Sequence, residues 1–132
     1  AASDVYKRQI NFLGDVVWES KKGNPRGFNP KFIHDEAWDV KATTDGGCIV
    51  VAGTGDEYGN YNRKCGNDGD NSNTWHVYLI RYNSNGEVVW EKTFGSDEGM
   101  DWAGEAIDLT NDGGSIIAVD DGSFGFLKTS NI

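Results

Sequence analysis

The oxygen-rich segment Asn67–Asn73 is the part of the sequence whose residue types best suit binding chemistry. It reads Asn-Asp-Gly-Asp-Asn-Ser-Asn, and calcium is held in proteins by about six to eight oxygen ligands from such groups. Asp68, Asp70 and Asn73 are therefore candidate calcium ligands, although the spacing and the closing Glu of an EF-hand loop are absent. The competing interpretation is a solvated polar loop, because Asn, Asp and Gly are also the ordinary residues of turns.

Aromatic and cysteine side chains surround this segment. Tyr58, Tyr61 and Trp75 flank it and are candidate contacts for a sugar or a peptide, or else a cover for the edge of a sheet. Cys65 lies within the insertion that holds the segment, and Cys48 begins an apolar run. A disulfide between the two cysteines would indicate an oxidising compartment, and the sequence leaves it open beside two free thiols.

Catalytic chemistry has little support in the sequence. His34 stands beside Asp35 and Glu36, but a metal site needs further converging ligands, so a surface-loop histidine is the preferred interpretation. His76 opens an apolar run and is expected to be packed or to lie at a strand edge. A nucleophile elbow and a phosphate-binding loop are missing, and no pair stands out among the 21 carboxylates. We therefore expect no enzyme activity, no catalytic residue and no cofactor other than calcium.

The composition indicates a folded, turn-rich β protein. A length of 132 residues suggests one domain, and five Trp, five Tyr and six Phe are too many for a disordered chain. Eighteen Gly against two Pro indicate many turns. The net charge of −9 argues against nucleic acid and anionic membranes as partners, and no apolar run approaches the roughly 18 residues of a membrane helix.

Two patterns recur along the chain. Gly14–Glu19, which reads Gly-Asp-Val-Val-Trp-Glu, returns as Gly-Glu-Val-Val-Trp-Glu in Gly86–Glu91. Thr43–Val50 returns as Thr110–Ile117, with a shared Thr-x-Asp-Gly-Gly core. Internal repeats of this kind indicate an architecture built from similar structural units.

A weaker third pattern sets the length of the unit. Val77–Tyr82 has a counterpart in Phe124–Thr129. The separation between matching positions shortens from the first pattern to the third, which places a short insertion in residues 21–32 and a longer one in residues 55–74. The bare unit without these insertions is about 47 residues long, which suits the roughly 40–50 residues of a four-stranded propeller blade.

Local signals predict four strands in the complete unit, over residues 37–43, 48–52, 77–80 and 87–94. Asp45–Gly47 is predicted as a hairpin turn, because glycine accepts the positive φ that such a turn requires. The second and third strands are continuous apolar runs, which is typical of strands buried on both faces. The fourth strand alternates and is expected to be more exposed.

A helical alternative attaches to two segments, residues 37–42 and 102–109, which contain Ala, Glu and spaced apolar residues. Both segments are short and lack a clear cap. Strand is therefore the preferred prediction for both.

The second copy of the unit reads Trp-x-Lys-Thr-Phe-Gly, then Asp-x-Ala, then Thr-x-Asp-Gly-Gly-x-Ile-Ile-Ala. This pattern resembles the β-propeller repeats of long bacterial secreted and cell-surface proteins, over about residues 14–130. The matching residues are Trp90, Lys92, Thr93, Phe94, Gly95, Asp101, Ala103, Ile107, Thr110, Asp112, Gly113, Gly114, Ile116, Ile117 and Ala118, with Tyr78, Leu79, Ile80 and Gly86.

The resemblance implies an all-β fold, a partial β-propeller of antiparallel four-stranded blades with about two blades present. The chain departs from the pattern at Cys48 and Ser115, where the repeats carry an aromatic residue, and at Val119, where they carry glycine. The long insertion in residues 55–74 is a further departure. These differences concern loop geometry rather than the fold.

The repeat divides the chain into four parts. Residues 1–9 match an in-frame translation of a transposase adapter from sequencing libraries, and we expect them to be an artefact rather than part of the protein. Residues 10–36 are expected to hold the outer strand of a preceding blade and a loop. Residues 37–95 form a complete blade with the insertion 55–74, and residues 96–132 form a truncated blade. We therefore expect a fragment of a longer protein.

The expected function is a structural or ligand-binding module of a larger extracellular or cell-surface protein. The implied partners are a protein or carbohydrate ligand and further blades, without nucleic acid or membrane insertion. One alternative is a quinone-dependent dehydrogenase propeller, whose blades share the Gly-x-x-x-Trp of Gly86–Trp90, although Ile80–Tyr82 replaces the expected Ala-x-Asp. A lectin-like β-prism that binds carbohydrate is the other alternative, suggested by the Val-Val-Trp-Glu strand.

Overall fold

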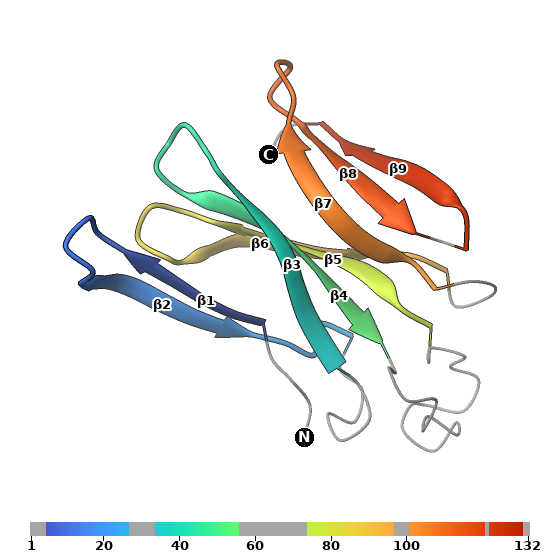
Figure 1. The fold of residues 1–132 in the computed structure, drawn as a ribbon, viewed down its shortest axis with the longest axis horizontal. Coiled ribbons are helices and arrows are strands. Elements are labelled where there is room, and N and C mark those ends of the chain that lie inside the picture. The colour runs from blue at the N-terminus through green and yellow to red at the C-terminus, as the bar shows by residue number, and fades with distance from the viewer. Residues whose placement is uncertain (1–4, 27–33, 56–73, 97–100, 121, 131–132) are drawn as a thin grey trace.

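The computed structural model describes residues 5–26, 34–55, 74–96, 101–120 and 122–130. Within these ranges the chain forms β-strands that are arranged in three antiparallel sheets (Figure 1). The first sheet contains β1 (Val5–Ile10) and β2 (Val16–Lys22). The second contains β3 (His34–Ala42), β4 (Cys48–Gly55), β5 (His76–Tyr82) and β6 (Val88–Phe94). The third contains β7 (Ala103–Leu109), β8 (Ser115–Asp120) and β9 (Phe124–Thr129).

The all-β prediction is confirmed for the described residues, and strand is the correct prediction for both ambiguous segments. Residues 37–42 belong to β3, and residues 103–109 form β7. In the second sheet the strands follow one another in the order β3-β4-β5-β6, as successive antiparallel neighbours. Its first strand begins at His34, three residues before the predicted start, because residues 34–36 continue the pairing with β4.

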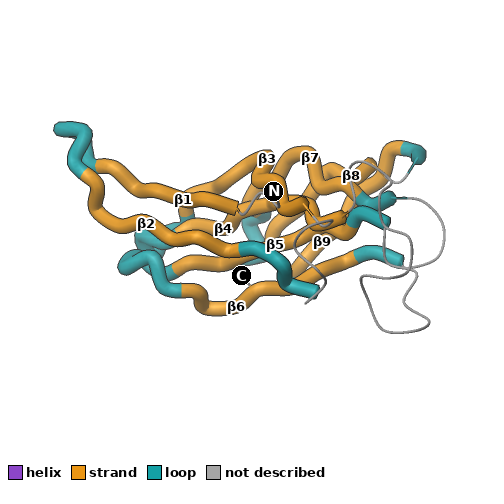
Figure 2. Tube along the Cα trace, turned by 90° about the horizontal axis from the view of Figure 1, so that it is seen from below, coloured by secondary structure: helices purple, strands orange, loops and turns teal. Residues whose placement is uncertain are grey.

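The three sheets lie face to face in the order of the chain (Figure 1). β7 packs against β3, β4 and β5 of the second sheet, and β1 packs against β3. Figure 2 shows β3 and β7, the first strands of their sheets, along one side of the stack, with β6 along the opposite side. The second sheet is therefore covered on both faces.

Burial of the second sheet follows from this position. Every residue of β4 and of β5 is buried, as the continuous apolar runs predict. One face, toward the first sheet, carries Cys48, Val50, Ala52, Tyr78, Ile80 and Tyr82. The other face packs Ile49, Val51, Val77 and Leu79 against Ile107, Ile117 and Val119 of the third sheet.

The two tryptophans of the repeated Val-Val-Trp pattern have corresponding places, as the repeat predicts. Trp18 on β2 packs against the second sheet and stacks on Tyr82, with ring centroids 5.7 Å apart. Trp90 on β6 packs against the core shared with the third sheet. Both side chains are half-buried, because each lies on the outermost strand of its sheet.

Trp90→Ala tests this packing. Full burial would predict a loss of about 3–5 kcal/mol, and the half-buried ring reduces the expected loss to about 2 kcal/mol of unfolding free energy. Chemical denaturation followed by circular dichroism measures it. A loss below about 0.5 kcal/mol, the size of an ordinary surface substitution, would show that the ring does not pack on the neighbouring sheet.

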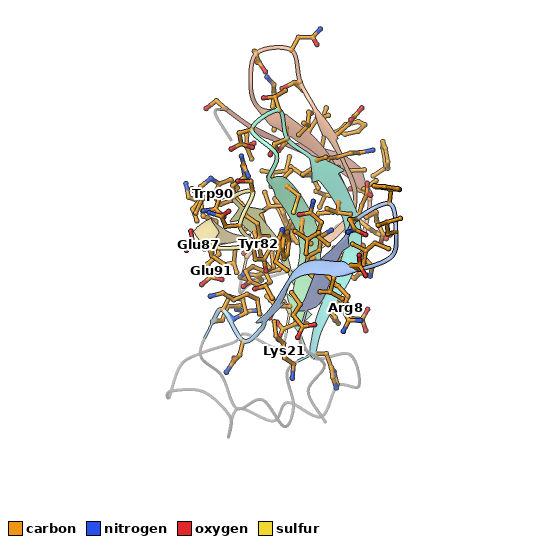
Figure 3. All side chains as sticks on the ribbon, turned by 90° about the vertical axis from the view of Figure 1, so that its left-hand side faces the viewer. Arg8, Lys21, Tyr82, Glu87, Trp90 and Glu91 are labelled. Carbon is orange, nitrogen blue, oxygen red and sulfur yellow. The ribbon has the colours of Figure 1, made fainter. Side chains whose placement is uncertain are left out.

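Glu91 links the first and second sheets through polar contacts. Its carboxylate accepts a hydrogen bond from the Tyr78 hydroxyl at 2.6 Å and lies 3.3 Å from Nζ of Lys22. Burial, followed by this carboxylate, raises the pKa of Tyr78 far above its usual value. Figure 3 shows Glu91 with Glu87 and Trp90 on the side of β6, and Arg8 and Lys21 on the β1–β2 hairpin.

β1 occupies part of the segment that we expect to be an artefact. It pairs with β2 in the way that β5 pairs with β6: Lys7 lies opposite Ser20, and Leu79 lies opposite Lys92. Lys7 thus stands where β5 carries a buried leucine, and burial lowers its pKa. The pairing shows how these residues fold. That residues 1–9 are a translated sequencing adapter stays a prediction.

Candidate functional site

The Asp-Gly-Gly turn between β3 and β4 is held together by one carboxylate. Asp45 accepts hydrogen bonds from the Thr43 hydroxyl at 2.6 Å and from the Gly47 amide at 3.1 Å. Its other oxygen lies 2.6 Å from Nη2 of Arg81 on β5. Gly46 has a φ of +84°, which glycine adopts without the steric cost that a side chain would add. The predicted turn is confirmed, and the Asp45 carboxylate stabilises it.

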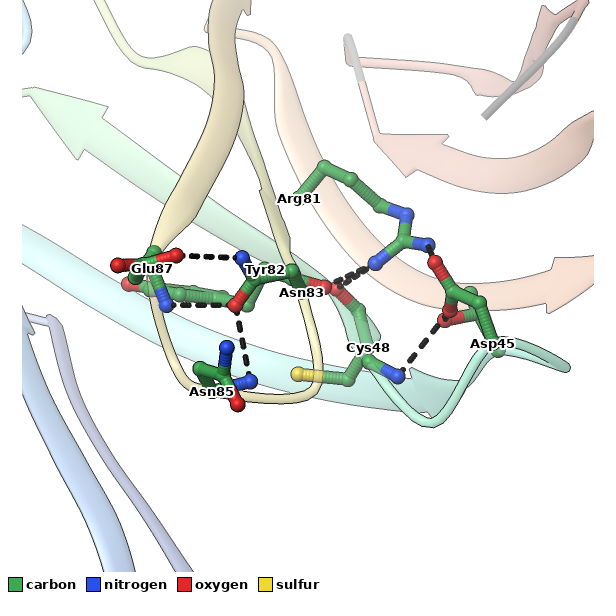
Figure 4. A network of polar contacts seen from close by, with 9 residues as sticks. Asp45, Cys48, Arg81, Tyr82, Asn83, Asn85 and Glu87 are labelled. Atoms are coloured by element: carbon green, nitrogen blue, oxygen red, sulfur yellow. Dashed lines mark hydrogen bonds and ion pairs between the residues drawn. The ribbon is translucent and has the colours of Figure 1, made fainter.

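Arg81 ties this turn to the third strand of the sheet. Its side chain is only 6% exposed, and Nη1 donates to the carbonyl oxygens of Cys48 and Tyr82 (Figure 4). Burial of a guanidinium is tolerated where its donors are paired with acceptors in this way.

The turn between β7 and β8 repeats the arrangement with other residues. Asp112 accepts hydrogen bonds from the Thr110 hydroxyl and from the Gly114 amide, the first at 2.5 Å and the second at 3.3 Å. Nζ of Lys128 on β9 takes the place of the guanidinium. We call the Asp45–Arg81 and Asp112–Lys128 contacts, with their turns, the two clasps.

Both carboxyl groups are held in the charged form. Hydrogen bonds from Thr43 and the Gly47 amide, with Arg81 beside them, lower the pKa of Asp45 to about 2. Lys128, followed by Thr110, lowers the pKa of Asp112 well below its usual value. The charged acids therefore stabilise the folded chain at neutral pH.

Acid should remove this stabilisation. A carboxyl group whose pKa is lowered by folding contributes above its unfolded pKa, near 3.8, and loses that contribution as the pH falls toward 2. We expect the melting temperature to drop across this interval, and to drop less steeply in Asp45→Asn. Thermal melts from pH 5 to pH 2 measure both slopes. Equal slopes for the two proteins would contradict the role of Asp45.

The turn between β1 and β2 and the turn between β5 and β6 form a second matched pair. Oδ1 of Asn83 accepts hydrogen bonds from the amides of Asn85 and Glu87, at 2.9 and 3.0 Å. Oδ1 of Asn11 does the same for Leu13 and Asp15, both at 2.9 Å. The sequence comparison began the repeat at Gly14. The shared Asn, three residues before the glycine in each copy, extends it.

A hollow of about 560 Å³ lies between the two clasps. Thr43, Thr44, Thr110 and Asn111 contribute hydroxyl and amide groups to its lining beside apolar surface, and Arg81 lies at its wall. These groups can bind a polar ligand by hydrogen bonds. The sequence did not indicate this hollow, since it forms only where two units meet.

A row of buried polar side chains crosses the other end of the second sheet. Asp35 lies opposite Thr54, and Thr54 lies opposite His76, so the three share one face. All three are buried, and Asp35 accepts a hydrogen bond from the Asn24 amide at 2.7 Å. Their proximity depends on strand register, which no local motif encodes.

The structure confirms the prediction for one histidine and contradicts it for the other. His76 is packed, as predicted. The prediction for His34 is wrong: it is buried at the start of β3 and not on a surface loop. The pairing of β3 with β4 extends back to His34 and draws this residue into the sheet.

Trp75 packs on the second sheet beside two glycines of β4. Its ring lies 5.7 Å from that of Trp38, beside Gly53 and Gly55, where a Cβ would overlap the rings. Its amide donates to Asp101 at 2.8 Å. The other two candidate ligand contacts, Tyr58 and Tyr61, lie outside the described residues.

The candidate calcium ligands Asp68, Asp70 and Asn73 also lie outside the described residues, as does Cys65. Calcium binding stays a prediction. Within the described ranges no three His, Cys, Asp or Glu side chains are grouped to hold a metal ion. Cys48 is a buried free thiol there, and burial raises its pKa.

Comparison with protein-family models found no match, and no curated protein matches the sequence. The part of the chain that the structure describes has no helix long and apolar enough to cross a membrane.

Proposed function

We propose that the chain is a segment of a β-propeller and serves as a non-catalytic structural or ligand-binding module of a larger secreted or cell-surface protein. The observation that carries this proposal is the stacking of three sheets whose turns repeat at matching positions. Propellers are built by radial repetition of four-stranded antiparallel sheets, and the second sheet has that composition.

Irregularities in the strand pairing support the proposal. The register of β3 and β4 shifts between Ala37 and Asp39, and that of β7 and β8 shifts at the matching place in the repeat, between Gly104 and Ala106. The shift between Arg81 and Tyr82 likewise has a counterpart in the first sheet, between Gln9 and Ile10. Bulges are specific features of a fold, so their repetition favours one unit used several times.

The outer face of the third sheet supports a longer series. Val77 and Leu79 are fully buried in β5, whereas Phe124 and Phe126, at the same positions of β9, are 77% and 64% exposed. Apolar patches of this kind mark surfaces that another element covers. In a propeller the next blade would cover them.

The polar groups favour a structural or binding role. The acids of both clasps are engaged in holding turns, and the hollow between them offers hydroxyl and amide groups to a protein or carbohydrate ligand. We also propose a secreted or cell-surface location, because the repeats resemble those of bacterial surface proteins.

Assembly in solution tests the proposal. The chain alone is expected to self-associate or to be poorly soluble, because its outer faces are apolar. Phe124→Ser combined with Phe126→Ser should shift light scattering toward the monomer. Phe12→Ser, at a turn residue that is 95% exposed, should change it little. A monodisperse parent monomer with a cooperative melt would instead indicate a self-contained fold.

A further inference from the structure

β9 has one edge that no described strand covers. Its other edge pairs with β8 from Asp120 to Ser115. β5, the corresponding strand of the second sheet, pairs on both sides, with β4 and with β6. An open edge presents unpaired backbone donors and acceptors, which can bind an added strand.

The third sheet matches the first three strands of the second sheet closely enough to transfer the pairing. The clasps agree, because Asp112 and Lys128 repeat the contact of Asp45 and Arg81. The bulges of the two sheets also fall at matching positions of the repeat. β9 is therefore equivalent to β5, as β8 is to β4. The uncovered edge of β9 corresponds to the edge of β5 that pairs with β6.

The register of β6 on β5 says which side chains would meet. Val77 lies opposite Phe94, Leu79 opposite Lys92 and Arg81 opposite Trp90. The third repeated pattern places Phe124, Phe126 and Lys128 at these three β5 positions.

A docked strand with the sequence of β6 would thus form three favourable cross-strand pairs. Its Phe would face Phe124, its Lys would face Phe126, and its Trp would face Lys128. Opposite residues in antiparallel strands interact directly. The first pair is aromatic, and the other two place a cation near an aromatic ring.

We propose that the free edge of β9 binds an extended strand of the pattern Val-Val-Trp-x-Lys-Thr-Phe, antiparallel and in the register of β6 on β5. This inference rests on the proposed function, since it treats the third sheet as a unit that takes a fourth strand. It goes further by naming the pattern of the occupant and the stripe Phe124, Phe126 and Lys128 that selects it.

The chain supplies its own matched ligands for a test. The first peptide is Gly86–Gly95, which contains β6, and the second is Gly14–Gly23, which contains β2. The second keeps the Trp but has Ser20 and Lys22 where the first has Lys92 and Phe94. It therefore loses the pair with Phe126 and has a Lys in place of the Phe that would face Phe124, so it should bind about two- to fivefold more weakly.

The experiment measures fluorescence anisotropy of each labelled peptide against the full chain at concentrations low enough to limit self-association. We expect saturable binding at one site for the Gly86–Gly95 peptide. The chain variant Phe126→Ala should weaken it about tenfold, whereas Phe12→Ala should leave it unchanged. A peptide with Lys92→Pro should not bind, because residue 92 takes the place opposite the β5 position Leu79, where the backbone amides point toward the neighbouring strand, and proline has no amide proton to donate there.

Amide hydrogen exchange locates the bound peptide. Protection should rise in Phe124–Thr129 and stay constant in Val16–Lys22. Absence of saturable binding up to about 1 mM peptide, protection outside β9, or equal affinity for the proline peptide would overturn the inference. The light-scattering experiment tests the propeller proposal separately. If the chain self-associates through Phe124 and Phe126 but does not bind the peptide, strand docking at β9 is rejected and the propeller proposal is not.

Discussion

Gly47→Ala is expected to cost more than about 3 kcal/mol of unfolding free energy, a large part of the stability of an ordinary domain. A Cβ at this position would overlap the carbonyl oxygen of Tyr82 and would lie 2.5 Å from Nη1 of Arg81 and 3.0 Å from Cα of Asn83. Two of these three neighbours are backbone atoms of the adjoining strand and turn. The clasp therefore has to open for the side chain to fit.

The third sheet provides the matched pair of controls. A Cβ at Gly114 would overlap the carbonyl oxygen of Thr129, whereas a Cβ at Gly113 would meet nothing within 4 Å. Gly113 has a φ of +80°, so Gly113→Ala should cost only about 1–2 kcal/mol through the left-handed backbone. Gly114→Ala should behave like Gly47→Ala.

Thermal melts by circular dichroism rank the three variants. The expected order of stability places Gly113→Ala well above Gly47→Ala and Gly114→Ala. If Gly47→Ala melted within about 2 °C of the parent chain, the turn would not dock on the third strand as described.

The strands that the sequence predicts best are those whose burial is uniform. The apolar runs 48–52 and 77–80 lie inside β4 and β5, because strands covered on both faces need no polar alternation. The Asp-Gly-Gly and Asn-Gly turns are predictable as well, since both need a residue with positive φ. Local chemistry decides these features.

Features that depend on distant pairing could not be predicted in the same way. Arg81 is a charged residue at the end of an apolar run, and its burial depends on Asp45, 36 residues earlier. The row Asp35, Thr54 and His76 forms only once three strands take their register. Neither contact leaves a signal in any short window of the sequence.

The candidate binding features also depend on contacts between distant parts of the chain. The hollow between the clasps needs two units side by side, and a single copy of the turn gives no sign of it. The sequence left Trp75 open between a ligand contact and a cover for the sheet, because its packing on Trp38 depends on Gly53 and Gly55 leaving room. The assignment of calcium to Asp68, Asp70 and Asn73 stays a prediction.

The central claim is that the second sheet is a middle layer with a core on each face. Leu79 and Ile80 are neighbours on β5, both fully buried, and they point to opposite faces. Leu79 belongs to the core shared with the third sheet, and Ile80 to the core shared with the first.

The most direct measurement is the unfolding free energy of Leu79→Ala and Ile80→Ala by chemical denaturation of monomeric chain, compared with the parent. Truncating a buried leucine or isoleucine costs about 2–5 kcal/mol, so both variants should lose that amount. A sheet with only one covered face would tolerate one of them. A loss of about 2–5 kcal/mol for both is the result predicted by stacked sheets, and a loss below about 1 kcal/mol for either would contradict it.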